Sequence, residues 1–106
     1  MRYEFYNTLK KTIGEWTYEV EERPTKFNIE GKPSEYEYYI KRWQKVLWFF
    51  KTTEYLYPFK DTMDVTVTSR PEYPFTPKRV KSAFIHFTRH INSYSVKRPY
   101  YGFSDY

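Results

Sequence analysis

The sequence predicts an α+β protein in which a small, mostly antiparallel sheet packs against helices. Residues 35–56 carry large apolar side chains at helical spacing, which indicates one long central helix. Residues 15–30 and 63–69 alternate apolar and polar side chains, as half-buried strands do. With 106 residues the chain has room for one domain. We expect a single compact domain over residues 1–96 and an aromatic, basic tail over residues 97–106.

A short N-terminal helix is expected over residues 3–13. Tyr6, Leu9 and Ile13 recur there at helical spacing, and Gly14 follows as a left-handed cap. The first residues also alternate in polarity, so a strand is the competing interpretation. We favour the helix.

Residues 15–30 are expected to form a β-hairpin. Two runs with a period of two are separated by the turn-forming residues 22–25. The apolar members are Trp16, Tyr18 and Val20 in the first run, and Phe27 and Ile29 in the second.

The central helix over residues 35–56 has predicted ends as well as a predicted apolar face. Ser34 and Glu37 have the spacing of a capping box, and Pro58 prevents the helix from continuing. This helix would be the element around which the domain is built. Its core-facing stripe would comprise Tyr36, Tyr39, Ile40, Trp43, Val46, Leu47 and Phe50.

A second surface is implied on the opposite side of the same helix, where further aromatic and basic side chains would project. Aromatic residues are enriched at protein interfaces, and they make up 24% of this chain. The surface would contact a partner protein or a second copy of the chain, or the hairpin would cover it. The candidate protein-interface residues are Tyr38, Lys41, Lys45, Trp48 and Phe49.

A further strand is expected over residues 63–69 because this segment is β-branched and alternating. A C-terminal helix is expected over residues 77–92, with Thr76 as its N-cap and Pro77 at its first position. The apolar stripe of this helix would comprise Val80, Ala83, Phe84, Phe87 and Ile91.

Positive charge is concentrated in the C-terminal part of the chain. The net charge is +5, and no acidic residue occurs between Glu72 and Asp105. Basic residues interleaved with aromatic rings are typical of surfaces that bind the phosphates and bases of nucleic acids. The candidate nucleic-acid-binding residues are Lys78, Arg79, Lys81, Arg89, Lys97, Arg98, Tyr100 and Tyr101.

Several kinds of chemistry are excluded or unsupported by the sequence. The chain has no Cys, which removes disulfides, thiol nucleophiles and cysteine-bound zinc, and its three glycines form no phosphate-binding loop. His86 and His90 have a spacing able to bind a metal, but no third ligand is evident. We therefore expect no catalytic residue, no metal site and no cofactor. A small metal-independent ribonuclease is the remaining enzymatic alternative.

We expect a small non-enzymatic binding protein whose basic C-terminal third binds a nucleic acid or acts in a nucleoprotein complex. The alternative is an inhibitor or adaptor that binds a host protein, for example of a defence system, through exposed aromatic side chains. The Tyr-rich, Ala-poor composition of this chain is common among accessory proteins of phages and viruses. The longest apolar run, residues 46–50, is too short to span a bilayer, so we expect no membrane partner and a cytoplasmic location.

Overall fold

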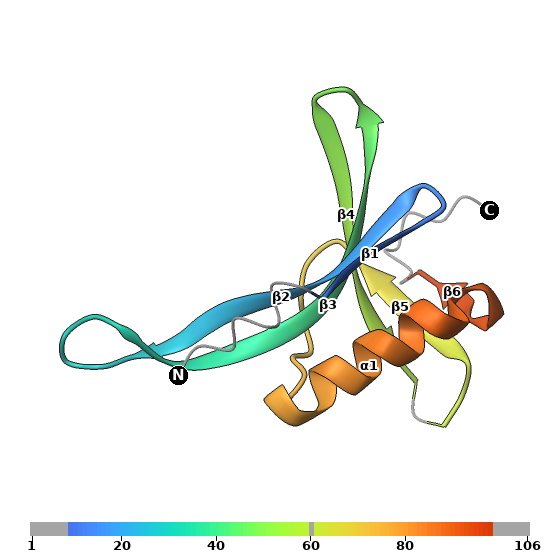
Figure 1. Ribbon diagram of the computed structural model, residues 1–106. Coiled ribbons are helices and arrows are strands. Elements are labelled where there is room, and N and C mark those ends of the chain that lie inside the picture. The colour runs from blue at the N-terminus through green and yellow to red at the C-terminus, as the bar shows by residue number, and fades with distance from the viewer. Residues whose placement is uncertain (1–8, 60, 99–106) are drawn as a thin grey trace, which may run out of the picture.

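The computed structural model describes residues 9–59 and 61–98. These residues form one six-stranded sheet with a single α-helix on one of its faces (Figure 1). The elements are β1 (Lys10–Ile13), β2 (Trp16–Phe27), β3 (Pro33–Leu47), β4 (Phe50–Pro58), β5 (Asp64–Thr68), α1 (Pro77–His90), a 3-10 turn (Ile91–Ser93) and β6 (Ser95–Lys97).

The strands lie side by side in the order in which they occur in the chain, β1 to β6. Strands β1 to β5 form an antiparallel meander, whereas β6 is parallel to β5 and is reached through α1. The β1–β2 turn consists of Gly14, at a positive φ of 63°, and Glu15. Two hairpins are longer than the rest of the sheet. The ends of β2–β3 and of β3–β4 therefore project from the body in different directions (Figure 1).

The hydrophobic core lies between α1 and one face of the sheet. Tyr38, Ile40, Leu56 and Val65 on the strands are completely buried, as is Val80 on the helix. Because strand side chains alternate, the neighbours of these residues in sequence point to the other face. The remaining buried members of this core are Tyr18, Val20, Val67, Phe84, Phe87 and Ile91.

The sheet face opposite α1 carries a smaller cluster of Tyr39, Tyr55 and Tyr57. The rings of Tyr39 and Tyr55 meet edge to face with their centroids 6.2 Å apart. The Tyr55 hydroxyl donates to Glu21 at 3.1 Å, and the Lys41 ammonium lies 3.0 Å from the same carboxylate oxygen. Burial opposes ionisation of Glu21, but the hydrogen bonds from Lys41 and Arg23 bring its pKa below the ordinary value. This face is therefore held together by polar contacts between aromatic rings and paired charges.

The tyrosines of this face predict a loss of stability in alkali. Burial, followed by the hydrogen bond to Glu37, raises the pKa of Tyr39 to about 12. In the unfolded chain a tyrosine titrates near 10, so the folded protein holds this proton more tightly. The free energy of unfolding should therefore be at its full value below about pH 10 and fall as the pH rises towards about 12.

Urea unfolding at a series of alkaline pH values measures this effect. Tyr39→Phe removes the titrating group. Between about pH 10 and about pH 12, the free energy of unfolding of this variant should therefore fall by less than that of the wild-type protein. An identical decline in both proteins would contradict the assignment to Tyr39.

The predicted central helix over residues 35–56 is wrong, and with it the predicted fold class. This segment forms most of β3, a two-residue turn and most of β4, which pair from Lys41 with Tyr55 to Leu47 with Phe50. The apolar side chains that suggested a helical stripe lie on both faces of the sheet and at the end of the hairpin. The element around which the domain is built is therefore β3, which pairs with β2 along one edge and with β4 along the other.

The N-terminal helix predicted over residues 3–13 is also wrong. Lys10–Ile13 form strand β1, which pairs with β2, whereas residues 3–8 lie outside the described part of the chain. The hairpin predicted within residues 15–30 is replaced by one continuous strand, β2, which passes through Pro24 with register shifts and pairs with β3. Backbone pairing along β3 thus overrides the turn signal at residues 22–25.

Two predicted elements are present. The strand expected over residues 63–69 is β5, Asp64–Thr68. The C-terminal helix expected over residues 77–92 is α1, Pro77–His90, with Thr76 at its N-cap and Pro77 in its first turn. Val80, Phe84 and Phe87 face the core as predicted.

Candidate nucleic-acid interface

The exposed side of α1 carries the basic residues that the sequence singled out. Lys78, Arg79, Lys81 and Arg89 are all exposed, while the opposite side of the helix is buried in the core. The first turn contains no acidic residue, so no carboxylate of the helix's own first turn reduces the positive potential of its N-terminus. The helix therefore presents its positive charges to the solvent.

Ion pairs divide the basic residues of the chain into two groups. Most of those on the sheet are paired with carboxylates, as in Lys41 with Glu19 and Glu21, whereas Lys45 and Lys51 near the end of the β3–β4 hairpin form no ion pair in the described part of the chain. Among residues 9–59 and 61–98, by contrast, Lys78, Arg79 and Arg89 form no ion pair. Further ion pairs in the described part of the chain are Lys10–Glu19, Arg23–Glu21, Lys26–Glu35, Lys32–Glu30, Arg42–Glu54, Arg98–Glu54 and Lys97–Asp64.

A cleft forms beside α1 because β4 leaves β3 part of the way along the sheet. The regular pairing of the two strands ends at Lys41 with Tyr55. At Tyr38, the position beside β3 is occupied by Phe75, whose backbone N–H donates to the Tyr38 carbonyl at 2.6 Å. The chain that connects β5 to α1 therefore lies where β4 would otherwise continue, and a cleft opens between this connection and β4.

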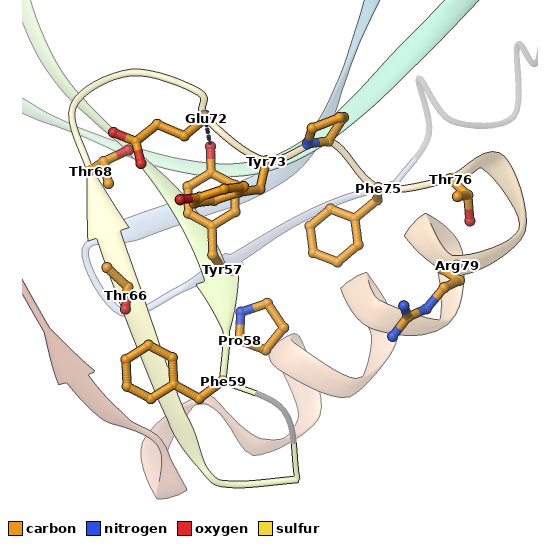
Figure 2. A pocket seen from close by; sticks show the side chains of 11 residues that line it. Tyr57, Pro58, Phe59, Thr66, Thr68, Glu72, Tyr73, Phe75, Thr76 and Arg79 are labelled. Atoms are coloured by element: carbon orange, nitrogen blue, oxygen red, sulfur yellow. Dashed lines mark hydrogen bonds between the residues drawn. The ribbon is translucent and has the colours of Figure 1, made fainter.

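The larger part of this cleft has a volume of about 810 Å³, within the range of small-molecule binding sites. One wall carries the rings of Tyr57 and Tyr73, which meet edge to face at 5.4 Å, while the Tyr57 hydroxyl accepts a hydrogen bond from the backbone N–H of Glu72 (Figure 2). The Arg79 side chain extends towards the cleft from α1 (Figure 2). The remaining lining residues are Pro58, Phe59, Thr66, Thr68, Pro74, Phe75 and Thr76.

A second hollow of about 380 Å³ follows the same side of α1. It shares Pro58, Phe75 and Arg79 with the larger part, so the two form neighbouring sections of one cleft. His86 and Tyr94 line the far section, where their rings meet edge to face at 5.8 Å. We call the two sections together the helix cleft. A cation and several aromatic rings therefore line it.

The two described basic residues of the predicted tail, Lys97 and Arg98, are both paired with carboxylates. Lys97 ends β6 and lies 3.6 Å from the Asp64 carboxylate, with its ammonium 5.4 Å from the centre of the Phe59 ring. Arg98 is exposed but is paired with Glu54 at 2.7 Å. Tyr100 and Tyr101 lie outside the described residues.

The structure separates the five residues that the sequence grouped as a protein interface. Tyr38 is completely buried beneath α1, and Lys41 is paired on the opposite face of the sheet. Lys45, Trp48 and Phe49 lie at the end of the β3–β4 hairpin, where Trp48 is 86% exposed. They form a surface of their own, remote in the fold from Tyr38.

The histidine pair lies along α1, with the ring centres of His86 and His90 4.8 Å apart. In the described part of the chain, no group of three or more potential metal ligands is found. Within the same residues, no helix is long and apolar enough to cross a membrane.

Several residues of the helix cleft were not singled out from the sequence, most clearly Phe59, Tyr73 and Phe75. Tyr73 and Phe75 lie in the proline-rich segment before α1, which indicated only an extended loop. The signal that could have found them was the placement of two aromatic residues between prolines, where rigid backbone holds side chains in fixed positions. Tyr73 is 65% exposed and Phe59 is 42% exposed, so both rings are accessible to a ligand.

Comparisons of this chain with protein-family models, with curated proteins and with solved structures find no match.

Proposed function

We propose that the protein binds nucleic acid through the exposed side of α1 and the helix cleft beside it. The observation that carries this proposal is the position of Arg79. Arg79 lies between Lys78 and Arg89, which like Arg79 form no ion pair in the described part of the chain, and a cleft lined by aromatic rings.

The site offers cations that can contact the phosphate of a nucleotide and aromatic rings that can contact its base. Lys78, Arg79 and Arg89 can contact phosphates, and the release of counterions that follows favours binding. The exposed rings of Tyr73 and Phe59 offer surfaces on which bases can stack. Stacking of this kind requires bases that are not paired, so we propose single-stranded nucleic acid as the ligand.

Reversal of three helix charges is expected to abolish this binding. Lys78→Glu, Arg79→Glu and Arg89→Glu together should weaken the affinity for a labelled single-stranded oligonucleotide by more than about 100-fold at about 50 mM salt. Fluorescence anisotropy titrations measure the affinity. The slope of its logarithm against the logarithm of salt concentration should fall by about 0.7 for each phosphate that the variant no longer neutralises.

The matched control changes the net charge equally elsewhere. Lys11, Lys26 and Lys32 are exposed on β1 and on the β2–β3 hairpin, and their replacement by Glu should leave most of the affinity intact. Equal losses in both triple variants would show that only net charge matters. Absence of binding by the wild-type protein at low salt would refute the proposal.

A single aromatic change tests the contribution of the cleft. Tyr73→Ala removes an exposed ring and should weaken binding to single strands by about 5- to 150-fold, which corresponds to about 1 to 3 kcal/mol of stacking. Duplex binding should change much less. A loss that is equal for single strands and duplexes would contradict stacking in the cleft.

The ribonuclease alternative is tested on the same samples, because Arg79 and His86 both line the cleft. Since we propose binding without catalysis, RNA incubated with the protein should remain intact on a denaturing gel.

The cytoplasmic location expected from the sequence stays a prediction.

A further inference from the structure

The end of the β3–β4 hairpin exposes five consecutive apolar side chains. We call residues 46–50 the aromatic tip; Trp48 and Phe49 form its turn. The exposed fractions are 58% for Val46, 52% for Leu47, 86% for Trp48, 60% for Phe49 and 55% for Phe50. The hairpin projects from the body of the protein (Figure 1), so the tip is its most outlying part in that direction.

The aromatic rings of the tip pack against one another. Trp48 and Phe49 have ring centres 4.9 Å apart, and those of Phe49 and Phe50 are 4.7 Å apart. An apolar group of this kind in contact with water is unfavourable, and contiguous exposed apolar patches commonly mark interaction sites. Because the hairpin end projects from the body (Figure 1), the tip can insert into a partner without a clash between the partner and the rest of the protein.

Two lysines lie directly behind the tip and face the same side of the sheet. Lys45 pairs with Lys51 across the two strands, and like charges in such a position repel each other. The Lys51 ammonium lies 4.2 Å from the centre of the Trp43 ring. No acidic residue occurs between Arg42 and Thr53, and neither lysine forms an ion pair within residues 9–59 and 61–98. The repulsion would be relieved by an anionic partner.

We propose that the aromatic tip inserts into the surface of an anionic lipid bilayer. Lys45 lies three residues behind Trp48, or roughly 10 Å along an extended strand. Interfacial segments bury their apolar side chains to a depth of about 5–10 Å, so the lysine ammonium groups would lie at the level of the lipid phosphates. Tryptophan is enriched at this boundary, and basic residues near it favour anionic lipids.

The charge of the flanking residues distinguishes this tip from the end of the β2–β3 hairpin. That hairpin also exposes apolar side chains, Phe27 at 59% and Ile29 at 105%. Its lysines are paired with glutamates, however, in Lys26–Glu35 and Lys32–Glu30. It therefore has the hydrophobic side chains without the unpaired positive charge.

This inference departs from the expectation that the protein has no membrane partner. That expectation rested on the shortness of the apolar run, which excludes spanning but does not exclude insertion from one side. The inference is independent of the proposed nucleic-acid binding because it concerns another part of the fold.

Flotation with lipid vesicles tests the inference. The wild-type full chain should bind vesicles of phosphatidylcholine with about 30% phosphatidylglycerol, and it should bind pure phosphatidylcholine roughly tenfold more weakly. Trp48→Ser with Phe49→Ser should weaken binding to the anionic vesicles by at least about tenfold. Lys45→Glu with Lys51→Glu should remove the preference for anionic lipid.

The control is Phe27→Ser with Ile29→Ser, which removes exposed apolar side chains from the other hairpin and should leave vesicle binding unchanged. In the wild-type protein, tryptophan emission should shift to shorter wavelength on binding; in Trp48→Phe, binding should persist but most of the shift should disappear. Circular dichroism confirms that each variant is folded.

Three outcomes would overturn the inference: no binding of the wild-type protein to anionic vesicles, equal binding after the Trp48→Ser and Phe49→Ser changes, or equal loss in the control. If light scattering instead shows a dimer that these two changes dissociate, and vesicles are not bound, the tip is a contact between copies of this chain and the inference is wrong.

Discussion

Phe87→Ala is expected to lower the free energy of unfolding by about 3 to 5 kcal/mol, because it empties a fully buried position in the main core. Phe87 is 1% exposed and joins α1 to the sheet. Its ring also packs against Tyr94, with the centroids 5.1 Å apart. Truncation would remove these interactions and leave a cavity that the surrounding strands cannot fully close.

Urea unfolding followed by circular dichroism measures this loss. Phe27→Ala is the matched control because Phe27 is 59% exposed, and its effect should stay within about 0.5 kcal/mol. Similar effects of the two changes would mean that α1 does not pack on the sheet as described. A loss that is confined to Phe87→Ala would support the arrangement of the core.

Glu54→Ala is expected to cost about 3 kcal/mol because it leaves a buried cation without its carboxylate. Arg42 is only 6% exposed, and two of its guanidinium nitrogens lie 2.8 and 2.7 Å from Glu54. The same guanidinium stacks on the Trp16 ring at 4.1 Å and donates to the Tyr18 hydroxyl at 3.3 Å. These interactions fix its position, so it cannot move into water without disrupting β2.

The control for this prediction removes a carboxylate from an exposed ion pair. Lys26 and Glu35 are 3.0 Å apart, but both side chains are more than half exposed. Glu35→Ala should therefore change the free energy of unfolding by less than about 1 kcal/mol. An equally small effect of Glu54→Ala would contradict the claim that the burial of Arg42 makes the loss of its carboxylate partner costly for the free energy of unfolding.

The misassigned helix has a physical explanation in β3. A strand is recognised from sequence when one of its faces is polar, but β3 has large side chains on both. Tyr38 and Ile40 face the main core, whereas Tyr39 lies in the tyrosine cluster on the other face and the Trp43 ring has the ammonium groups of Lys10 and Lys51 near it. A helical stripe can be drawn through such a pattern. The preference of Tyr, Trp and Val for strands was the better guide.

The C-terminal region was easier to predict because its signals are local. Thr76 and Pro77 mark the start of α1, and the spacing of Val80, Phe84 and Phe87 places them on one buried side. The same helical spacing places the basic residues of α1 on its exposed side. The sequence alone thus predicted which side of α1 is buried and which side carries the basic residues.

The cleft could not be predicted in the same way because it depends on contacts between distant segments. It exists because β4 leaves β3 beyond Tyr55 and because Phe75 takes the vacated position beside Tyr38. Register between strands depends on the whole sheet and has no short sequence signal. The extent of the aromatic tip could not be predicted for a related reason. The sequence placed Trp48 and Phe49 on an exposed surface but assigned Val46, Leu47 and Phe50 to the buried side of a helix, and only the hairpin turn at Trp48 and Phe49 exposes all five residues.

A backbone-amide NMR titration with a single-stranded oligonucleotide at low salt tests the proposed function most directly. We expect the largest chemical-shift changes at Tyr73, over α1 and at Tyr94, which border the helix cleft. The amides of residues 46–50 should not move. Changes centred on Tyr39 and Glu21 of the open sheet face or on a hairpin end, or no change at low salt, would contradict the assignment of nucleic-acid binding to α1 and its cleft.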